Sequence, residues 1–153
     1  MKRKTPPTDL HLDTLAVRAG VEPSQYSENS EALYLTSSFT QPDSETAARR
    51  FSGEEDGYIY SRFTNPTVAS MEKRLAALES TQACVGTSSG MSAVLLMCMG
   101  LLKAGDHVVC SQSMFGSTLK LIGTEFAKFG VTSTFVSQSD VQAWRAAVKP
   151  QTR

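Results

Sequence analysis

The most restrictive feature of this sequence is that residues 65–153 alternate between segments with helical spacing and short runs rich in β-branched residues. Apolar residues recur at three- and four-residue steps in the first kind of segment, as in Val68, Met71 and Leu75. The alternation is typical of βαβ units, so we predict an α/β fold with a parallel sheet covered by helices. The expected order is helix 65–80, strand 82–85, helix to Leu102, strand 107–110, helix 117–129, strand 131–136 and a helix capped by Asp140.

The first 64 residues lack this regularity. Four prolines interrupt residues 1–50 (Pro6, Pro7, Pro23 and Pro42), and only TLAVRAG (14–20) predicts a short helix there, ended by Gly20. FSGEEDGYIYSRF (51–63) is expected to form an irregular, partly extended loop. We therefore predict an N-terminal arm over 1–64, followed by the sheet domain over 65–153. The last residues, KPQTR, stand where a further strand is expected, which predicts the front part of a longer protein.

Composition restricts the choice of ligands. The 15 basic and 15 acidic residues give a formal net charge of zero, which argues against the broad positive surface of nucleic-acid binders and membrane-surface proteins. The three cysteines (Cys84, Cys98 and Cys110) form no CxxC pair and have apolar neighbours, which favours a reducing, cytoplasmic setting. The sequence shows neither a signal-peptide core nor an apolar run long enough to span a bilayer, so we expect a soluble protein.

The loop GTSSGM (86–91) follows the first expected strand and begins a helix. Such a loop lies at the edge of the sheet formed by the carboxyl ends of the strands, where ligands of parallel sheets commonly bind. The amide N–H groups and the dipole of the following helix favour an anion such as phosphate there. The loop lacks the spacing of a P-loop or of GxGxxG. Ser88 or Ser89 could equally be a simple cap of a buried helix, and the loop alone leaves both interpretations open.

Two other short motifs are candidates, although each alone is more typical of ordinary structure. Phe115 lies in the next loop on the same edge, where its ring could stack on a planar ligand. Tyr60 and Arg62 are two residues apart, so in an extended segment both side chains would leave on one side and could bind phosphate oxygens. We expect no metal site, because GEEDG (53–57) lacks calcium-loop spacing; His107 is expected to be structural.

Taken together, these segments resemble the Cys/Met-metabolism family of pyridoxal-phosphate (PLP) enzymes. The resemblance covers TLAVRAG, GYIYSRFTNPTVASMEKRLAALE, GTSSGMSA, GDHVV and MFGST, which span most of the chain in family order. It implies the front part of the large parallel-sheet domain of a fold type I, aspartate aminotransferase-like, PLP enzyme. It also implies that the arm carries a loop that contacts a second subunit.

The resemblance also implies roles for particular residues. Ser89 and the amides of Gly90 and Met91 would hold the cofactor phosphate, and Phe115 would stack on the pyridine. Tyr60 and Arg62 would reach the phosphate in a neighbouring subunit of a homodimer or homotetramer. The lysine that binds the cofactor and the aspartate at its pyridine nitrogen would both lie beyond Arg153, so no catalytic residue is assigned within this sequence.

The activity implied is γ-replacement. Phe115 followed by glycine is more similar to O-succinylhomoserine sulfhydrylases than to the lyases, many of which carry tyrosine there. The substrates would be a homoserine ester and sulfide, which give homocysteine and succinate in methionine biosynthesis. The alternatives left open are cystathionine γ-synthase, O-acetylhomoserine sulfhydrylase and methionine γ-lyase activity, or an inactive phosphate-binding or interaction fragment.

Overall fold

The structure is a computed structural model that describes residues 10–153. These residues form two compact units, one ending at Gly86 and one running from Thr87 to Arg153. Each unit is described by itself below. The boundary between the units differs from the domain boundary after residue 64 expected from the sequence, because the helix over residues 66–78 packs against the preceding arm. The division into an arm over 1–64 and a sheet domain over 65–153 stays a prediction. Pro6 and Pro7 lie outside the described residues.

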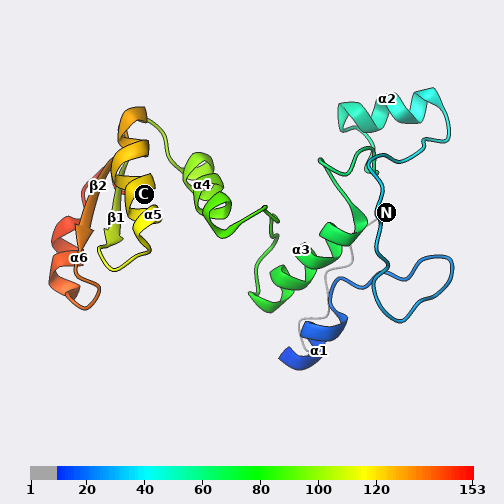
Figure 1. Ribbon diagram of the computed structural model, residues 1–153, viewed down its shortest axis with the longest axis horizontal. Coiled ribbons are helices and arrows are strands. Elements are labelled where there is room, and N and C mark those ends of the chain that lie inside the picture. The colour runs from blue at the N-terminus through cyan, green and yellow to red at the C-terminus, as the bar shows by residue number, and fades with distance from the viewer. Residues whose placement is uncertain (1–9) are drawn as a thin grey trace. The chain divides into compact units, whose positions relative to one another are not determined.

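In the first unit, helix α1 (Leu12–Arg18) packs against α3 (Pro66–Leu78) (Figure 1). The turn after α1 makes the contact: Ser70 Oγ donates a hydrogen bond of 2.9 Å to the carbonyl of Gly20, which has φ +78°. Arg74 adds a 3.0 Å bond from Nε to the carbonyl of Ala19. The predicted helices 14–20 and 65–80 are thereby confirmed, with their bounds shifted by a few residues.

Helix α2 (Ser44–Ser52) was not expected, because residues 1–50 were predicted to hold only one helix and residue 51 to begin a loop. Its start is capped by Asp43, whose side chain accepts from the amide of Thr46 at 2.7 Å, and its end by Gly53 at φ +80°. The helix is short and has few apolar residues, so it was not recognised from the sequence. Capping and the Arg49 and Arg50 ion pairs with Glu55 stabilise it instead.

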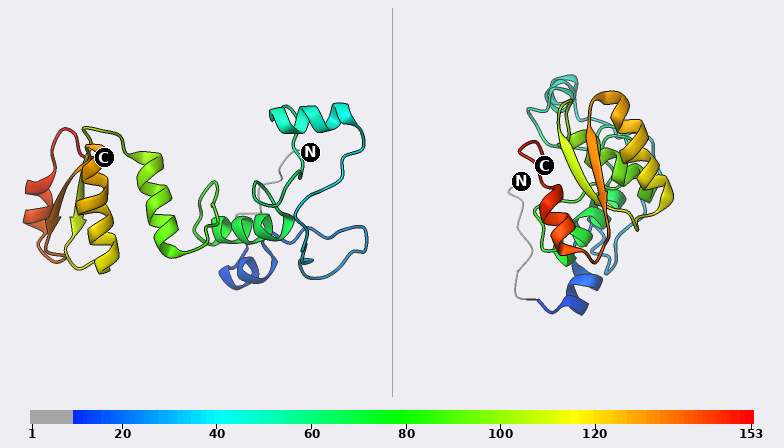
Figure 2. Two further views of the ribbon diagram at one scale, coloured as in Figure 1. Left: turned by 45° about the horizontal axis from the view of Figure 1, so that its top comes forward. Right: turned by 90° about the vertical axis from the view of Figure 1, so that its left-hand side faces the viewer.

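The second unit contains a parallel sheet. Strands β1 (His107–Ser111) and β2 (Thr132–Val136) pair from His107 opposite Thr132 to Ser111 opposite Val136. A helix of mixed geometry connects them and consists of α5 (Gly116–Lys120), the π-helical η1 (Leu121–Glu125) and the 3₁₀ turn η2 (Phe126–Phe129). This connecting helix covers one face of the sheet, and α6 (Val141–Ala147) lies on the other (Figure 2). The parallel α/β prediction is confirmed here.

The strand predicted over 82–85 is absent from the described residues. The chain there has no neighbouring strand to pair with, and the amide of Gly86 donates instead to Glu72 Oε1 at 2.6 Å. The free edge of β1 is used by the last residues of the chain: the amide of His107 donates to the carbonyl of Gln151 at 3.0 Å, and that of Arg153 donates back to His107 at 3.1 Å. Parallel pairing thus begins where a further strand was expected.

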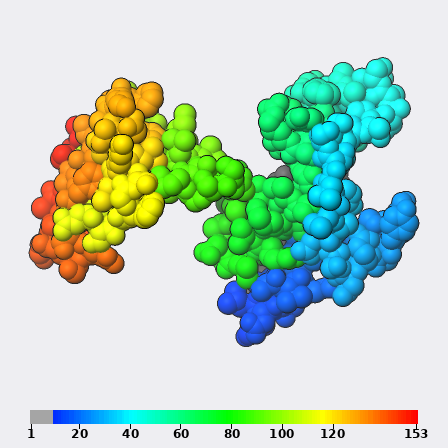
Figure 3. All heavy atoms as spheres, in the orientation of Figure 1, coloured from blue at the N-terminus to red at the C-terminus, as the bar shows by residue number. Residues whose placement is uncertain are grey.

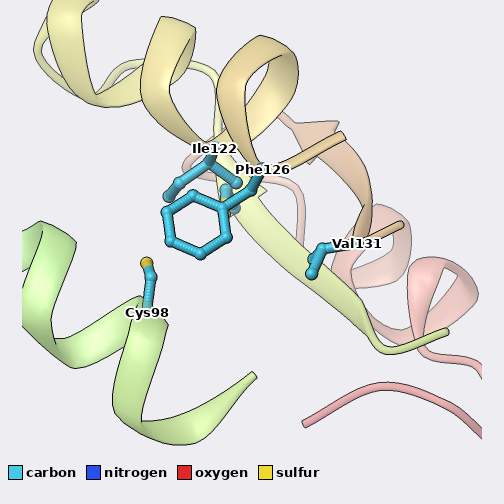
Figure 4. Packing of buried hydrophobic residues seen from close by; sticks show 5 residues of the cluster. Cys98, Ile122, Phe126 and Val131 are labelled. Atoms are coloured by element: carbon cyan, nitrogen blue, oxygen red, sulfur yellow. The ribbon is translucent and has the colours of Figure 1, made fainter. Parts of the chain in front are cut away.

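The core of this unit lies between the sheet and two helices. Cys98 of α4 (Gly90–Leu101) faces Ile122 and Phe126 of the connecting helix, with Val131 beside them (Figure 4). Cys110 completes the buried cluster from β1. Atoms of the sheet and its helices, yellow to red in Figure 3, pack into one continuous body. The cluster fixes α4 against β1, and so fixes where the loop before α4 ends.

His107 is structural, as predicted. It is fully buried, and its ring nitrogens lie 2.8 Å from Thr134 Oγ1 and 2.8 Å from Thr152 Oγ1. Burial lowers the pKa of the imidazole, and the nearby charge of Lys149 lowers it further. The ring is therefore neutral near pH 7 and joins β1 to β2 and to the last residues.

Candidate functional site

The start of α4 forms the first part of the candidate site. Ser89 is the N-cap, with an extended backbone (φ −164°, ψ 161°), and its Oγ accepts from the amide of Ser92 at 3.1 Å. Ser88 and Ser92 bring two further hydroxyls to the same point, with Ser92 Oγ 2.9 Å from Ser89 Oγ and 3.3 Å from Ser88 Oγ. Three hydroxyl groups therefore surround the beginning of this helix.

Two amides at this helix start remain available. The first turn of an α-helix leaves N–H groups without intrahelical acceptors. Within residues 10–153, the N–H groups of Gly90 and Met91 donate no hydrogen bond. Gly90 is exposed, and no atom lies within 4 Å of where a Cβ would stand, so a ligand can approach its backbone closely. The helix dipole adds a partial positive charge here. This end of α4 fits an anion such as a phosphate monoester.

Phe115 begins the next helix on the same edge of the sheet. It occupies the N-cap of α5 without a side-chain hydrogen bond, and its ring is 72% exposed. This exposure leaves a ring face free to stack on a planar group, and Phe129 in the same unit is equally exposed at 71%. Within the described residues, Phe115 is therefore not part of the buried core.

One contact joins these two loops. The hydroxyl of Thr118, a buried residue of α5, donates to Met91 Sδ at 3.6 Å. Sequence reasoning missed Thr118; the signal was a hydroxyl residue three positions after Phe115, at the point where its helix meets another. The contact brings the start of α5 to the start of α4. An anion site and an exposed aromatic ring thus belong to one region of this unit, which fits a phosphorylated aromatic ligand.

Tyr60 and Arg62 lie in the first unit. Tyr60 pairs antiparallel with Ser38, and the chain then turns, with the amide of Phe63 donating to the carbonyl of Tyr60 at 2.9 Å. Arg62 is therefore in a turn. The expectation that Tyr60 and Arg62 leave one side of an extended segment is wrong. They are nevertheless together, since the guanidinium lies 5.5 Å from the centre of the Tyr60 ring and 4.7 Å from that of Phe63.

The Arg62 guanidinium is exposed, and no carboxylate within the described part of the chain pairs with it. Stacking on two rings orients the guanidinium plane and leaves its N–H groups for an outside acceptor. Together with the Tyr60 hydroxyl, it can bind the oxygens of a phosphate. The structure thus brings Ser89, Gly90, Met91 and Phe115 to one region of the second unit, and it brings Tyr60 and Arg62 together in the first.

A family model described as "Cys/Met metabolism PLP-dependent enzyme" matches residues 13–153 of this chain. The chain is 49% identical over 142 residues to an O-succinylhomoserine sulfhydrylase of Pseudomonas aeruginosa; the match covers 93% of this chain and 35% of the relative. It is 41% identical over 142 residues to an L-methionine gamma-lyase of Fusobacterium nucleatum subsp. polymorphum, covering 93% of this chain and 36% of that protein. It therefore spans about a third of the length of these relatives.

The structure is also similar to a solved one, a putative O-acetylhomoserine (thiol)-lyase from Campylobacter jejuni described with N'-pyridoxyl-lysine-5'-monophosphate. The TM-score is 0.85 with 27% sequence identity, over 95% of this chain and 36% of the other. None of the helices in residues 10–153 has the length and apolar character needed to cross a membrane.

Proposed function

Because the chain belongs to the Cys/Met metabolism PLP-dependent enzyme family, with the fold type I architecture of those enzymes, we propose that the start of α4 binds the phosphate of PLP. The amides of Gly90 and Met91 would donate to phosphate oxygens, with the Ser89 hydroxyl beside them. The observation that carries this assignment is the pair of unpartnered amides at an exposed, glycine-opened helix start. Phe115 would stack on the pyridine ring.

Bound PLP withdraws electrons from an amino acid, which makes the protons at its Cα and Cβ acidic enough to remove. The residues of this chain would bind and orient the cofactor for that chemistry. The start of α4 would bind the phosphate and Phe115 would stack on the pyridine ring, so the cofactor would be held at two separate points. The lysine and the aspartate that the family uses are proposed to lie outside these 153 residues, and we assign no proton transfer to a residue within them.

For the reaction, we propose γ-replacement with O-succinylhomoserine and sulfide as substrates. The Cγ–O bond to succinate breaks, a Cγ–S bond to sulfide forms, and the products are homocysteine and succinate. Support comes from the 49% identity to the Pseudomonas aeruginosa sulfhydrylase and from phenylalanine at position 115. The similarity to an L-methionine gamma-lyase favours methionine γ-elimination as the second candidate.

Steady-state assays of the complete polypeptide encoded by this reading frame separate the candidates. We expect homocysteine from O-succinylhomoserine and sulfide, at a kcat/KM well above that for O-acetylhomoserine. Cysteine as the preferred acceptor would indicate a cystathionine γ-synthase, and release of methanethiol from methionine would indicate the lyase. Sequencing the frame beyond Arg153 tests the enzyme proposal itself: without a lysine for PLP there, only a binding or interaction fragment remains.

We further propose that the site is shared between subunits of a cytoplasmic homodimer or homotetramer. In this arrangement Tyr60 and Arg62 would bind the phosphate held by α4 of the neighbouring subunit. Support comes from the Arg62 guanidinium, which stacks on the Tyr60 and Phe63 rings at the surface of the first unit. Its N–H groups and the Tyr60 hydroxyl have no hydrogen-bond partner among the described residues. The three free cysteines, two of them buried, are compatible with a reducing compartment.

Mixing two inactive variants tests the sharing. Arg62→Gln would damage the donated turn, and Gly90→Val would damage the phosphate loop. If sites are shared, random reassociation restores about one quarter of the wild-type sites, because each mixed dimer has one site with neither defect. If each site lies within one subunit, mixing restores none.

A further inference from the structure

The Tyr60–Phe63 turn is held in place by a residue that has no role in the function proposed so far. Asn65 follows the turn, is 7% exposed, and caps α3 by accepting from the amide of Thr67 through Oδ1 at 2.9 Å. Its Nδ2 donates twice, to the carbonyl of Tyr34 at 3.0 Å and to Ser61 Oγ at 3.0 Å. One buried amide therefore connects a helix start, the arm and the turn.

The two halves of this amide have separable tasks. The oxygen supports the helix, and any good N-cap residue could replace it there. The nitrogen supports the turn, because it holds Ser61, the residue between Tyr60 and Arg62. Ser61 in turn donates to the carbonyl of Thr36 through Oγ and to that of Ser37 through its amide, the latter at 2.9 Å.

We propose that Asn65 is a positioning residue for the phosphate contacts of Tyr60 and Arg62. It acts through Ser61: the Nδ2 bonds fix the backbone between the two side chains, so that the hydroxyl and the guanidinium are held ready for one phosphate group. This inference rests on the proposed function of the turn. It concerns the cofactor affinity of the assembled enzyme and not the chemistry that follows.

The chain offers a matched control. Thr67, two residues along, also binds the arm: its Oγ1 accepts from the amide of Tyr34 at 2.9 Å and donates to the carbonyl of Ala32 at 3.2 Å. It makes no hydrogen bond with Ser61. Thr67→Val thus removes arm contacts from the same helix start while leaving the turn held by Asn65.

The test is PLP binding to the apoenzyme of the complete polypeptide, compared with binding of pyridoxal, which lacks the phosphate. Asn65→Asp and Asn65→Ser both keep a capping oxygen and lose the Nδ2 donors. We expect each to weaken PLP binding about tenfold and pyridoxal binding less than about twofold, with Thr67→Val changing neither beyond about twofold. The effect should largely vanish in an Arg62→Gln background, because the two residues act on one contact.

Each other outcome overturns the inference. Unchanged PLP affinity in both Asn65 variants, equal losses for PLP and pyridoxal, or losses that add fully to those of Arg62→Gln would reduce Asn65 to a structural cap. Unchanged PLP affinity in Arg62→Gln alone would refute the proposed role of the turn and, with it, that of Asn65. A refuted turn is thus distinguished from a turn that works without Asn65.

Discussion

The hydroxyl of Thr118 points at the sulfur of Met91, 3.6 Å away, and this contact sets the start of α5 against the start of α4. Thioether sulfur is a weak acceptor, so the hydrogen bond contributes less to stability than the packing of the two side chains does. Its effect is to keep the Phe115 loop beside the two amides proposed to bind phosphate.

Thr118→Val tests that arrangement. Valine keeps the shape and removes the hydroxyl, so we expect the free energy of unfolding to fall by no more than about 1 kcal/mol. Thr118→Ala also removes a buried methyl group and should cost about 1 kcal/mol more. Urea unfolding of both variants gives the comparison; a loss for valine as large as that for alanine would show that the hydroxyl contributes more than the packing of the methyl group.

Ser89→Asp separates helix capping from anion binding. Aspartate caps helices as well as serine does, and its charge favours the helix dipole, so α4 should keep its stability. The same charge would repel a phosphate at the Gly90 and Met91 amides, and we expect PLP affinity to fall by at least about tenfold.

Asp140→Ser makes the reverse exchange at the N-cap of α6, where Asp140 Oδ1 accepts from the amide of Ala143 at 2.9 Å. It should alter neither stability nor PLP affinity appreciably. Thermal unfolding and absorbance titration measure the two quantities. PLP binding by Ser89→Asp at wild-type affinity would contradict the phosphate assignment.

Gly20→Ala should be strongly destabilising. The backbone there has φ +78°, and an added Cβ would lie 2.2 Å from the carbonyl oxygen of Ser70. Gly53→Ala is the matched control, since φ is +80° but nothing lies within 4 Å. We expect about 1 kcal/mol for the control from conformation alone, and at least about 2 kcal/mol more for Gly20. Equal costs in chemical denaturation would mean that the arm shifts to relieve the clash.

His107 predicts a pH dependence of stability. Its pKa in the folded protein is lowered, mainly by burial, so the unfolded chain binds more protons at mildly acidic pH. The contribution of the neutral His107 ring to the free energy of unfolding is fully present above the unfolded pKa of about 6.5. It is lost as the pH falls from there towards the lower pKa of the folded protein. The urea midpoint at pH 8 and pH 5.5 should therefore differ less in His107→Gln than in the wild type.

Most of the second unit followed from the sequence, because its strands are rich in β-branched residues, Gly130 ends the connecting helix and Asp140 caps α6. The π-helical and 3₁₀ parts of the connecting helix were not predicted. Prediction failed where long-range pairing decides the outcome. Residues 82–85 were predicted as a strand but have no neighbouring strand in their unit. Residues 151–153, in contrast, have no strand pattern in the sequence and pair with β1. Helix α2 was missed because it is short and has few apolar residues, and its caps and ion pairs were not recognised from the sequence.

The residues of the candidate site also divide into those predicted from local sequence and those recognised only from contacts in the structure. Ser89, Gly90, Met91 and Phe115 were predicted as site residues because ligands commonly bind in loops at the ends of parallel strands and because these segments resemble the family. Thr118 was not, because its partner Met91 lies 27 residues away. The bond from Asn65 to Ser61 was not predicted either, because it depends on how the Tyr60–Phe63 turn folds back. Residues that support a site are recognised from their contacts in the structure, and the spacing of residues along the sequence is a weak signal for them.

The pairing of residues 151–153 with β1 has a practical consequence for anyone who shortens this chain. A cut before Gln151 would remove the acceptor of the His107 amide and the hydroxyl at His107 Nδ1 in one step. The imidazole of His107, fully buried in the intact chain, would then lose the hydrogen-bond partner of one ring nitrogen. Expression boundaries intended to keep the second unit intact should include Arg153.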